Sequence, residues 1–187
     1  MTPMIETERL ILRGWCDGDV EPWARMNADP KVREFFGDLY SRERAITTAT
    51  NLRKELERDG YGTFIVEVKD RMRFAGIITL REVPFHAHFT PANEIGWRFV
   101  VDAWGHGHAT EAGQAALNFA FRQLRWTEIV AFTSEINVRS RRVMERLGMT
   151  HNSDDDFDYP HMAEGNRLRR CVLYRIRKAP SLPLDAT

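Results

Sequence analysis

A strand, a glycine-containing loop and a helix follow one another directly between Glu94 and Phe121, and this order strongly constrains the fold. The segment EIGWRFVV alternates in side-chain character, which predicts a strand over 94–101. The loop WGHGHA follows and carries Gly105 and Gly107. The next segment has small or apolar residues at every fourth position, which predicts a helix packed close to a sheet: Ala112, Ala116, Ala120 and Leu124.

Further strands and helices are predicted on both sides of this unit. Ser41 is a suitable N-cap for a helix that Gly60 would end, and the dipeptide Asp29-Pro30 would end an earlier helix. Strands are predicted over 9–13, 63–68, 74–80, 128–133 and 171–176, and helices over 17–28, 41–59 and 137–148. The order is an antiparallel run of strands, then strand–helix–strand–helix–strand, so we expect an α/β fold.

Composition excludes several classes of protein. The 187 residues suit one domain, and 27 basic against 27 acidic side chains provide no general attraction for nucleic acid. The N-terminal segment lacks the pattern of a signal peptide, and no apolar run reaches the roughly 18 residues of a membrane span. Cys16 and Cys171 form no disulfide framework or zinc motif. We therefore expect a cytoplasmic protein without a nucleic-acid or membrane partner.

The glycine loop has three interpretations: a tight turn, a phosphate-binding loop or part of a metal site. Backbone N–H groups at a helix N-terminus bind phosphate, but Thr110 replaces a glycine of the dinucleotide fingerprint and no Walker motif is present. Glu111 in the first helical turn argues against an anion. The pairs His86-x-His88 and His106-x-His108 suggest a metal, yet no cysteine or carboxylate pattern completes a site. We expect no metal.

Four segments together carry a resemblance to a known family. The loop WGHGHATEA resembles the acyl-CoA pyrophosphate loop of the GCN5-related N-acetyltransferase (GNAT) superfamily, with Trp104 where the family has Gln or Arg. ETERLILR, EIGWRFV and NVRSRRVMERLGM resemble further elements of the branch of ribosomal-protein alanine N-acetyltransferases. The likeness covers Ile5 to Ile176. It implies a single domain over residues 1–178, with a GNAT-type mixed, mostly antiparallel central sheet flanked by helices, and a flexible C-terminal tail over 179–187.

The resemblance also implies where acetyl-CoA, the co-substrate, would bind. Backbone groups of Phe99 and Val101 would bind the pantetheine arm, and so would the side chain of Asn137. Ser140 would lie near the thioester sulfur and protonate the departing thiolate. The alternative role of Asn137 is to cap the following helix, and the alternative for Ser140 is a solvated helix position. The pyrophosphate would bind main-chain groups of the loop, which comprises Trp104, Gly105, His106, Gly107, His108, Ala109 and Thr110.

The implied reaction is direct acetyl transfer to a primary amine, either a protein N-terminus or a small molecule. The amine must lose a proton, and Glu94 is the candidate base; a structural hydrogen bond is its alternative role. Aspartates in the segment 151–170 either attract a cationic acceptor or form a solvated loop. A non-catalytic acyl-CoA-binding regulatory module is the alternative function. We expect a monomer or a homodimer.

Overall fold

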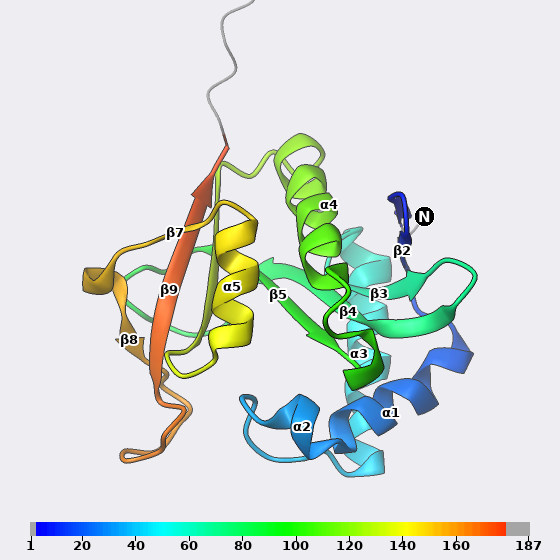
Figure 1. Cartoon of the computed structure of the whole chain (residues 1–187), viewed down its shortest axis with the longest axis horizontal. Coiled ribbons are helices and arrows are strands. Elements are labelled where there is room, and N and C mark those ends of the chain that lie inside the picture. Colours follow the sequence, from blue (N-terminus) through cyan, green and yellow to red (C-terminus); the bar gives the residue numbers. More distant parts are fainter. Residues whose placement is uncertain (1–2, 179–187) are drawn as a thin grey trace, which may run out of the picture.

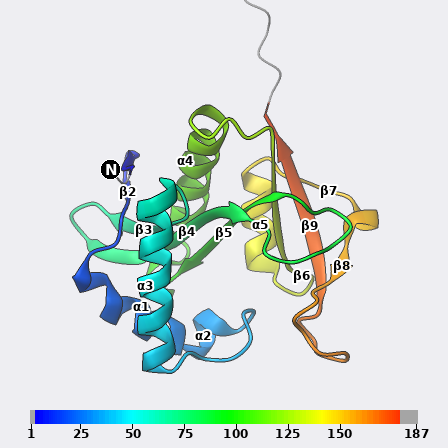
Figure 2. The ribbon, with the colours of Figure 1, turned by 180° about the vertical axis from the view of Figure 1, so that it is seen from behind.

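The computed structural model describes residues 3–178, which form one nine-stranded sheet with helices on both faces (Figures 1 and 2). The strands lie in the order β1-β2-β3-β4-β5-β6-β9-β7, and β8 pairs with β9. The strands are β1 (Ile5–Glu6), β2 (Leu10–Arg13), β3 (Thr63–Val68), β4 (Met72–Glu82), β5 (Asn93–Phe99), β6 (Glu128–Ser134), β7 (Thr150–His151), β8 (Phe157–Asp158) and β9 (Arg170–Arg177). The helices are α1 (Val20–Ala28), α2 (Pro30–Arg33), α3 (Arg42–Asp59), α4 (His108–Arg122) and α5 (Val138–Arg146).

Strand pairing is antiparallel except between β5 and β6, near the middle of the sheet. Neighbouring strands from β1 to β5 pair antiparallel, as do β6, β7 and β8 with β9 where they meet. The pair β5 and β6 is parallel, which the intervening helix α4 makes possible. The mixed, mostly antiparallel sheet flanked by helices is therefore confirmed.

Helices cover both faces of the sheet. Helices α4 and α5 lie on the face nearer the viewer in Figure 1, and α3 lies on the face nearer the viewer in Figure 2. The predicted small-residue stripe of α4 is fully buried at Ala112, Ala116 and Ala120, as expected for a helix that packs closely on β4 and β5. The hydrophobic core includes Phe64 of β3 and Leu117 of α4, both 0% exposed.

Most predicted boundaries are close to the observed ones. Ser41 caps α3 by accepting the N–H of Arg44, and Gly60 ends it in the left-handed conformation. The strand expected over 94–101 is too long at its end: β5 stops at Phe99, because the chain turns where the carbonyl of Val101 accepts the N–H of Trp104. Helix α2 was not predicted. Within residues 3–178 no helix combines the length and apolar character needed to cross a bilayer. The expected tail over 179–187 lies outside the described residues.

Candidate acetyl-CoA site

Strands β5 and β6 meet at one point and then separate. Among the described residues their one Cα pair is Glu94 opposite Val130. A cleft of about 450 Å³ lies beyond this pair, at the carboxyl ends of both strands, where open α/β sheets usually bind ligands. Its walls come from β5 (95–99), β6 (132–133), the segment 31–36 around α2, the glycine loop with the first turn of α4, and α5.

The glycine loop forms a turn that exposes main-chain N–H groups. Gly105 and Gly107 both have φ of +79°, a left-handed conformation that glycine adopts at little cost. Helix α4 begins at His108, so the N–H groups of its first turn have no partner within the helix. Together with the positive end of the helix dipole, these groups suit a bound phosphate.

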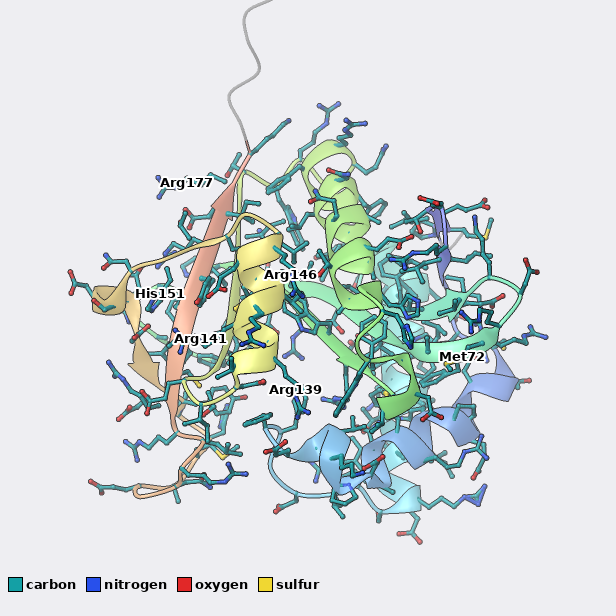
Figure 3. The ribbon with its side chains drawn as sticks, in the orientation of Figure 1. Met72, Arg139, Arg141, Arg146, His151 and Arg177 are labelled. Carbon is teal, nitrogen blue, oxygen red and sulfur yellow. The ribbon has the colours of Figure 1, made fainter. Side chains whose placement is uncertain are left out.

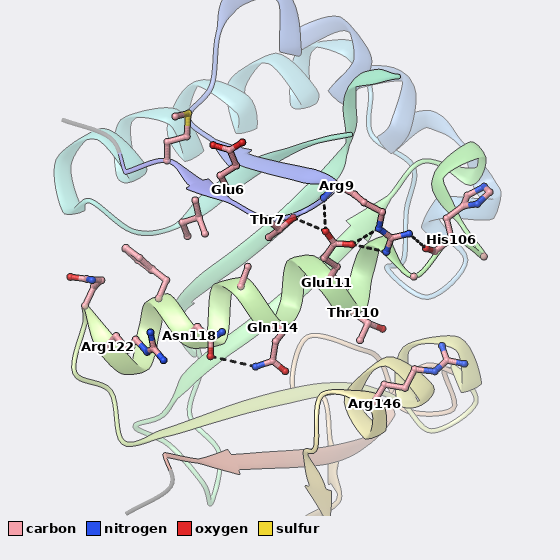
Figure 4. Close-up of a pocket in the computed structure, with 17 residues that line it drawn as sticks. Glu6, Thr7, Arg9, His106, Thr110, Glu111, Gln114, Asn118, Arg122 and Arg146 are labelled. Carbon is pink, nitrogen blue, oxygen red and sulfur yellow. Dashed lines mark hydrogen bonds and ion pairs between the residues drawn. The ribbon is translucent and has the colours of Figure 1, made fainter. Parts of the chain in front are cut away.

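Thr7 and Arg9 contact Glu111 at the start of α4, and Arg9 also contacts the glycine loop (Figure 4). Glu111 accepts hydrogen bonds from the Thr7 hydroxyl at 2.6 Å and from the Arg9 main chain at 3.0 Å, and it pairs with the Arg9 guanidinium at 2.6 Å. Nη1 of Arg9 also donates to the carbonyl of His106 at 2.9 Å. Burial opposes ionisation of Glu111, but these donors outweigh it and lower its pKa. The negative charge that argued against an anion in this turn is therefore neutralised by the chain itself.

The lining of the cleft is mostly apolar, and its charged residues are all basic. None of the described residues that line it is Asp or Glu. Figure 3 shows Arg146 on the side of α5 that faces α4, and Arg139 toward the end of α5 nearer α2. A cleft with one sign of charge concentrates oppositely charged ligands. Its Lys and Arg lining residues are Lys31, Arg98, Arg139, Arg142 and Arg146, of which Arg139 pairs with Glu34 at 2.8 Å.

Asn137 caps α5 and lies at the cleft with Ser140. Its Oδ1 accepts the N–H of Ser140 at 3.2 Å, and its Nδ2 donates to the Thr133 hydroxyl at 2.9 Å. The capping role weighed for Asn137 is therefore present in the structure. An amide has two N–H groups, so one remains for a ligand. Ser140 lines the cleft one turn inside the helix.

Trp104 connects the end of β5 to the glycine loop. Its indole N–H donates to the carbonyl of Phe99 at 2.9 Å, and the guanidinium carbon of Arg139 lies 4.3 Å from its ring centroid. Phe99, Trp104, Gly105, Gly107, His108, Ala109 and Thr110 all line the cleft. His106 instead lines the neighbouring groove between β1 and α4, and Val101 lines neither cavity.

Glu94 is buried at the closed end of the cleft and does not belong to its lining. The side chain is 8% exposed and forms an ion pair with Nε of Arg81 on the adjacent strand. Burial raises the pKa of Glu94, and the Arg81 charge acts in the opposite direction. The ion pair gives Glu94 the structural contact that was weighed against its role as a base. A raised pKa makes a carboxylate a stronger proton acceptor, so burial favours the role of a base.

Two of the aspartates among the remaining sequence candidates have side-chain partners within the described residues. Asp155 pairs with Arg175 at 2.9 Å, and Oδ1 of Asp156 lies 2.8 Å from Nε2 of His151. The ion pair of Asp155 with Arg175 favours the interpretation of an ordinary surface loop. The rings of His106 and His108 lie 5.4 Å apart. Across residues 3–178, no group of three or more His, Cys, Asp or Glu side chains is placed to hold a metal ion.

Two arginines that the sequence reasoning did not select contribute to this region. Arg9 lies in the segment ETERLILR, which was interpreted only as a strand, and it positions the glycine loop. Arg98 lies on β5 and lines the cleft. Its position on the polar side of an alternating strand was visible in EIGWRFV, but nothing in the sequence indicated that it lacks a carboxylate partner.

Comparison with known proteins identifies the family of this chain. The family described as "Acetyltransferase (GNAT) domain" matches residues 9–150. The chain is 30% identical over 156 residues to the FsC-acetyl coenzyme A-N(2)-transacetylase of Aspergillus fumigatus, covering 80% of this chain and 66% of the fungal protein.

Solved structures show the same fold. A GNAT-family acetyltransferase from Bacillus anthracis superposes with a TM-score of 0.77 and 26% identity, over 94% of this chain and 98% of that one. RimL, a ribosomal-protein alpha-N-acetyltransferase solved with coenzyme A, has a TM-score of 0.76 and 16% identity over 94% and 98% of the two chains. The chain therefore belongs to the GNAT acetyltransferases and is an N-acetyltransferase.

Proposed function

We propose that this chain transfers an acetyl group directly from acetyl-CoA to a primary amine. The observation that carries the proposal is the cleft between β5 and β6, which opens beside the first turn of α4 and has no acidic side chain among its described lining residues. The pantetheine arm would lie between the separated strands and hydrogen-bond to the second amide N–H of Asn137. The pyrophosphate would accept hydrogen bonds from the main chain of residues 106–110.

The transfer needs no covalent enzyme intermediate. The amine nitrogen attacks the thioester carbonyl carbon, the carbon–sulfur bond breaks, and the thiolate takes a proton either from water or from the Ser140 hydroxyl, which regains one from water. The amine's proton passes to Glu94, through water because Glu94 stands back from the lining. Neither cysteine lines the cleft, and burial raises the pKa of the Cys171 thiol to about 12, which makes it a poor nucleophile at neutral pH.

Two measurements test the proposal. Calorimetric titration with acetyl-CoA should show binding to the folded protein, and release of free thiol should accompany incubation with a panel of amines that includes peptides of differing N-termini. Absence of acetyl-CoA binding at high micromolar concentration would contradict the proposal. Binding without thiol release for any amine would favour the non-catalytic acyl-CoA-binding module.

Variants test the two assigned side chains. Ser140→Ala and Glu94→Gln should each lower kcat by about 100-fold, the lower end of the range for general acid–base groups. Because burial raises the pKa of Glu94, the acidic limb of the pH–rate profile should lie above 4.5, and Glu94→Gln should remove that limb. Ser153→Ala, at an exposed position remote from the cleft lining, is the matched control and should match the wild type.

A further inference from the structure

Arg98 reaches from β5 toward the opening of the cleft near α2. Its guanidinium carbon lies 4.1 Å from the centroid of the Phe36 ring and 5.7 Å from that of Trp23. Phe36 is 40% exposed and lines the cleft together with Arg98. Arg98 shares its side of the strand with Glu94, the candidate base, since alternate residues of a strand point the same way.

No carboxylate within residues 3–178 pairs with Arg98. One N–H of its guanidinium donates to Oδ1 of Asn27, and its Nε is buried without an acceptor. Arg33, which is 4% exposed, lies over the same Phe36 ring at 5.6 Å and also lacks a carboxylate; it donates to the carbonyls of Phe36 and Asp38. Two guanidinium groups are thus held around one ring, and neither forms an ion pair with a carboxylate of the described residues; Asp38 attracts Arg33 only from a longer distance.

Arg13, another partly buried arginine of this protein, forms ion pairs with two carboxylates. Arg13, whose side chain is 16% exposed, pairs with Asp19 at 2.8 Å and with Glu67 at 2.8 Å. Removing a charge from water is costly unless a partner compensates it. Burial and the neighbouring Arg33 lower the pKa of Arg98 to about 10, so the group stays charged at neutral pH. An unpaired charge that lines a substrate cleft points to a ligand that supplies the missing anion.

The phosphates of acetyl-CoA do not account for this anion in the proposed binding mode. They would bind at the first turn of α4 and beside Arg142 and Arg146 of α5. Arg98 contacts α1 and the segment that follows α2. A molecule approaching Arg98 would therefore enter beside α2 and meet the thioester from the acceptor side.

We propose that the acetyl acceptor is a small amine that also carries a carboxylate, and that Arg98 binds this carboxylate. The inference rests on the proposed acetyl transfer. The planar guanidinium offers paired N–H donors that match the two oxygens of a carboxylate. Amino acids belong to this class of amine. A polyamine does not, because it has no carboxylate, and its positive charges would meet Lys31 and Arg98 with no acidic lining residue to receive them.

The test compares amines that differ only in the carboxylate. Initial rates of thiol release are measured for an amino acid, its carboxamide and the amine that lacks the carboxyl group, with phenylalanine, phenylalaninamide and phenethylamine as one such set. A charge-assisted hydrogen bond discriminates by about 10- to 100-fold, so kcat/KM of the wild type should favour the acid by that ratio. Sets built on several side chains cover acceptors of different size.

Arg98→Gln should bring the ratio of acid to carboxamide close to one, mainly by raising KM for the acid, while leaving KM for acetyl-CoA unchanged. Arg98→Lys keeps the charge without the paired donors and should retain an intermediate ratio. Arg142→Gln removes the same charge from the α5 side of the cleft and is the matched control. It should raise KM for acetyl-CoA and leave the ratio of acid to carboxamide intact.

The outcomes separate this inference from the function on which it rests. Thiol release without preference for the carboxylate in any set would overturn the inference and leave acetyl transfer standing. The inference would also be overturned if Arg98→Gln and Arg98→Lys lowered kcat/KM for the acid and for the carboxamide by the same factor. That result is expected if Arg98 has only a structural role. A preference that appears only with acidic N-terminal peptides would also overturn it. Acetyl-CoA binding without thiol release from any amine would overturn both.

Discussion

Gly107 holds the loop before α4 in a backbone conformation that other residues adopt only with strain. Its φ of +79° is unfavourable for a β-branched side chain. We predict that Gly107→Val displaces the main-chain N–H groups and abolishes measurable acetyl-CoA binding by calorimetry.

His106→Ala and His108→Ala are the controls for this prediction, because the loop would bind the pyrophosphate with main-chain groups. Each should change the acetyl-CoA dissociation constant by less than about fivefold, which is about 1 kcal/mol. Loss of binding in both histidine variants together with retained binding in Gly107→Val would show that side chains hold the ligand.

Glu111 couples the stability of the loop to pH. Its pKa lies below the ordinary 4.5 because hydrogen bonds from Thr7 and Arg9 outweigh the effect of burial. A carboxyl group with a lowered folded pKa stabilises the protein fully above its unfolded pKa, and the stabilisation disappears as the pH falls through the folded pKa. Glu111→Gln should therefore cost about 1 to 2 kcal/mol at pH 7, since Arg9 is half exposed and solvent weakens the pair.

Denaturant unfolding at a series of pH values measures this difference. The gap between wild type and Glu111→Gln should be constant above about pH 5 and should narrow as the pH falls below it. A gap independent of pH down to about pH 3 would mean that Glu111 acts through shape and not through charge.

Asn137 caps α5 with its side-chain oxygen and has an amide N–H that would donate to acetyl-CoA. A substitution can remove the second role and keep the first. Serine caps helices about as well as asparagine, so Asn137→Ser should change the free energy of unfolding by less than about 0.5 kcal/mol. It removes the amide N–H, so the acetyl-CoA dissociation constant should rise by about tenfold. Unchanged affinity in a stable variant would identify Asn137 as a cap alone.

At the scale of elements, β4 and β5 approach each other closely where the cleft opens. A Cβ at Gly76 would lie 2.2 Å from the carbonyl oxygen of Arg98 and 2.7 Å from Cα of Phe99. Gly76→Ala must therefore push β5 outward and should destabilise the fold by about 1 to 3 kcal/mol in denaturant unfolding.

Gly96 provides the matched position on β5, since a Cβ there would meet nothing within 4 Å. Gly96→Ala should leave the free energy of unfolding within about 0.5 kcal/mol of the wild type. Equal destabilisation by both substitutions would show that loss of glycine, and not the close approach of the strands, is responsible.

The elements with strong local signals could be predicted from the sequence. The alternation in TFIVEV, the stripe of alanines in α4 and the Ser41 and Gly60 boundaries of α3 each follow from periodicity or capping. The short elements could not be predicted, because α2 (Pro30–Arg33) has one turn and β1, β7 and β8 have two residues each. Periodicity has no meaning over so few positions.

The candidate site was only partly accessible to sequence reasoning. The glycine loop and Asn137 lie in contiguous sequence motifs, which can be recognised without knowledge of the fold. The roles of Arg9 and Arg98 depend on partners about 100 and 71 positions away, at Glu111 and Asn27, so spacing along the chain could not show them. Glu94 was selected because a carboxylate can act as a base. Only the fold shows that Glu94 already forms an ion pair with Arg81.

At the scale of the molecule, the sheet consists of two parts, β1–β5 and β6–β9, that share one Cα pair at Glu94 and Val130 among the described residues. A pantetheine arm bound between β5 and β6 would form hydrogen bonds where the two strands do not pair with each other. Hydrogen exchange at 95–99 and 130–134 should therefore slow when acetyl-CoA binds, while exchange in α3 should change little. Equal slowing everywhere would indicate general stabilisation instead.

Such a co-substrate also acts as a structural part. A ligand that binds only the folded chain adds about 2.7 kcal/mol of stability at 100 times its dissociation constant. That is a large share of the margin by which a domain of this size usually stays folded. The lifetime of the protein against proteases, and not only its rate of turnover, would then follow the supply of acetyl-CoA in its surroundings.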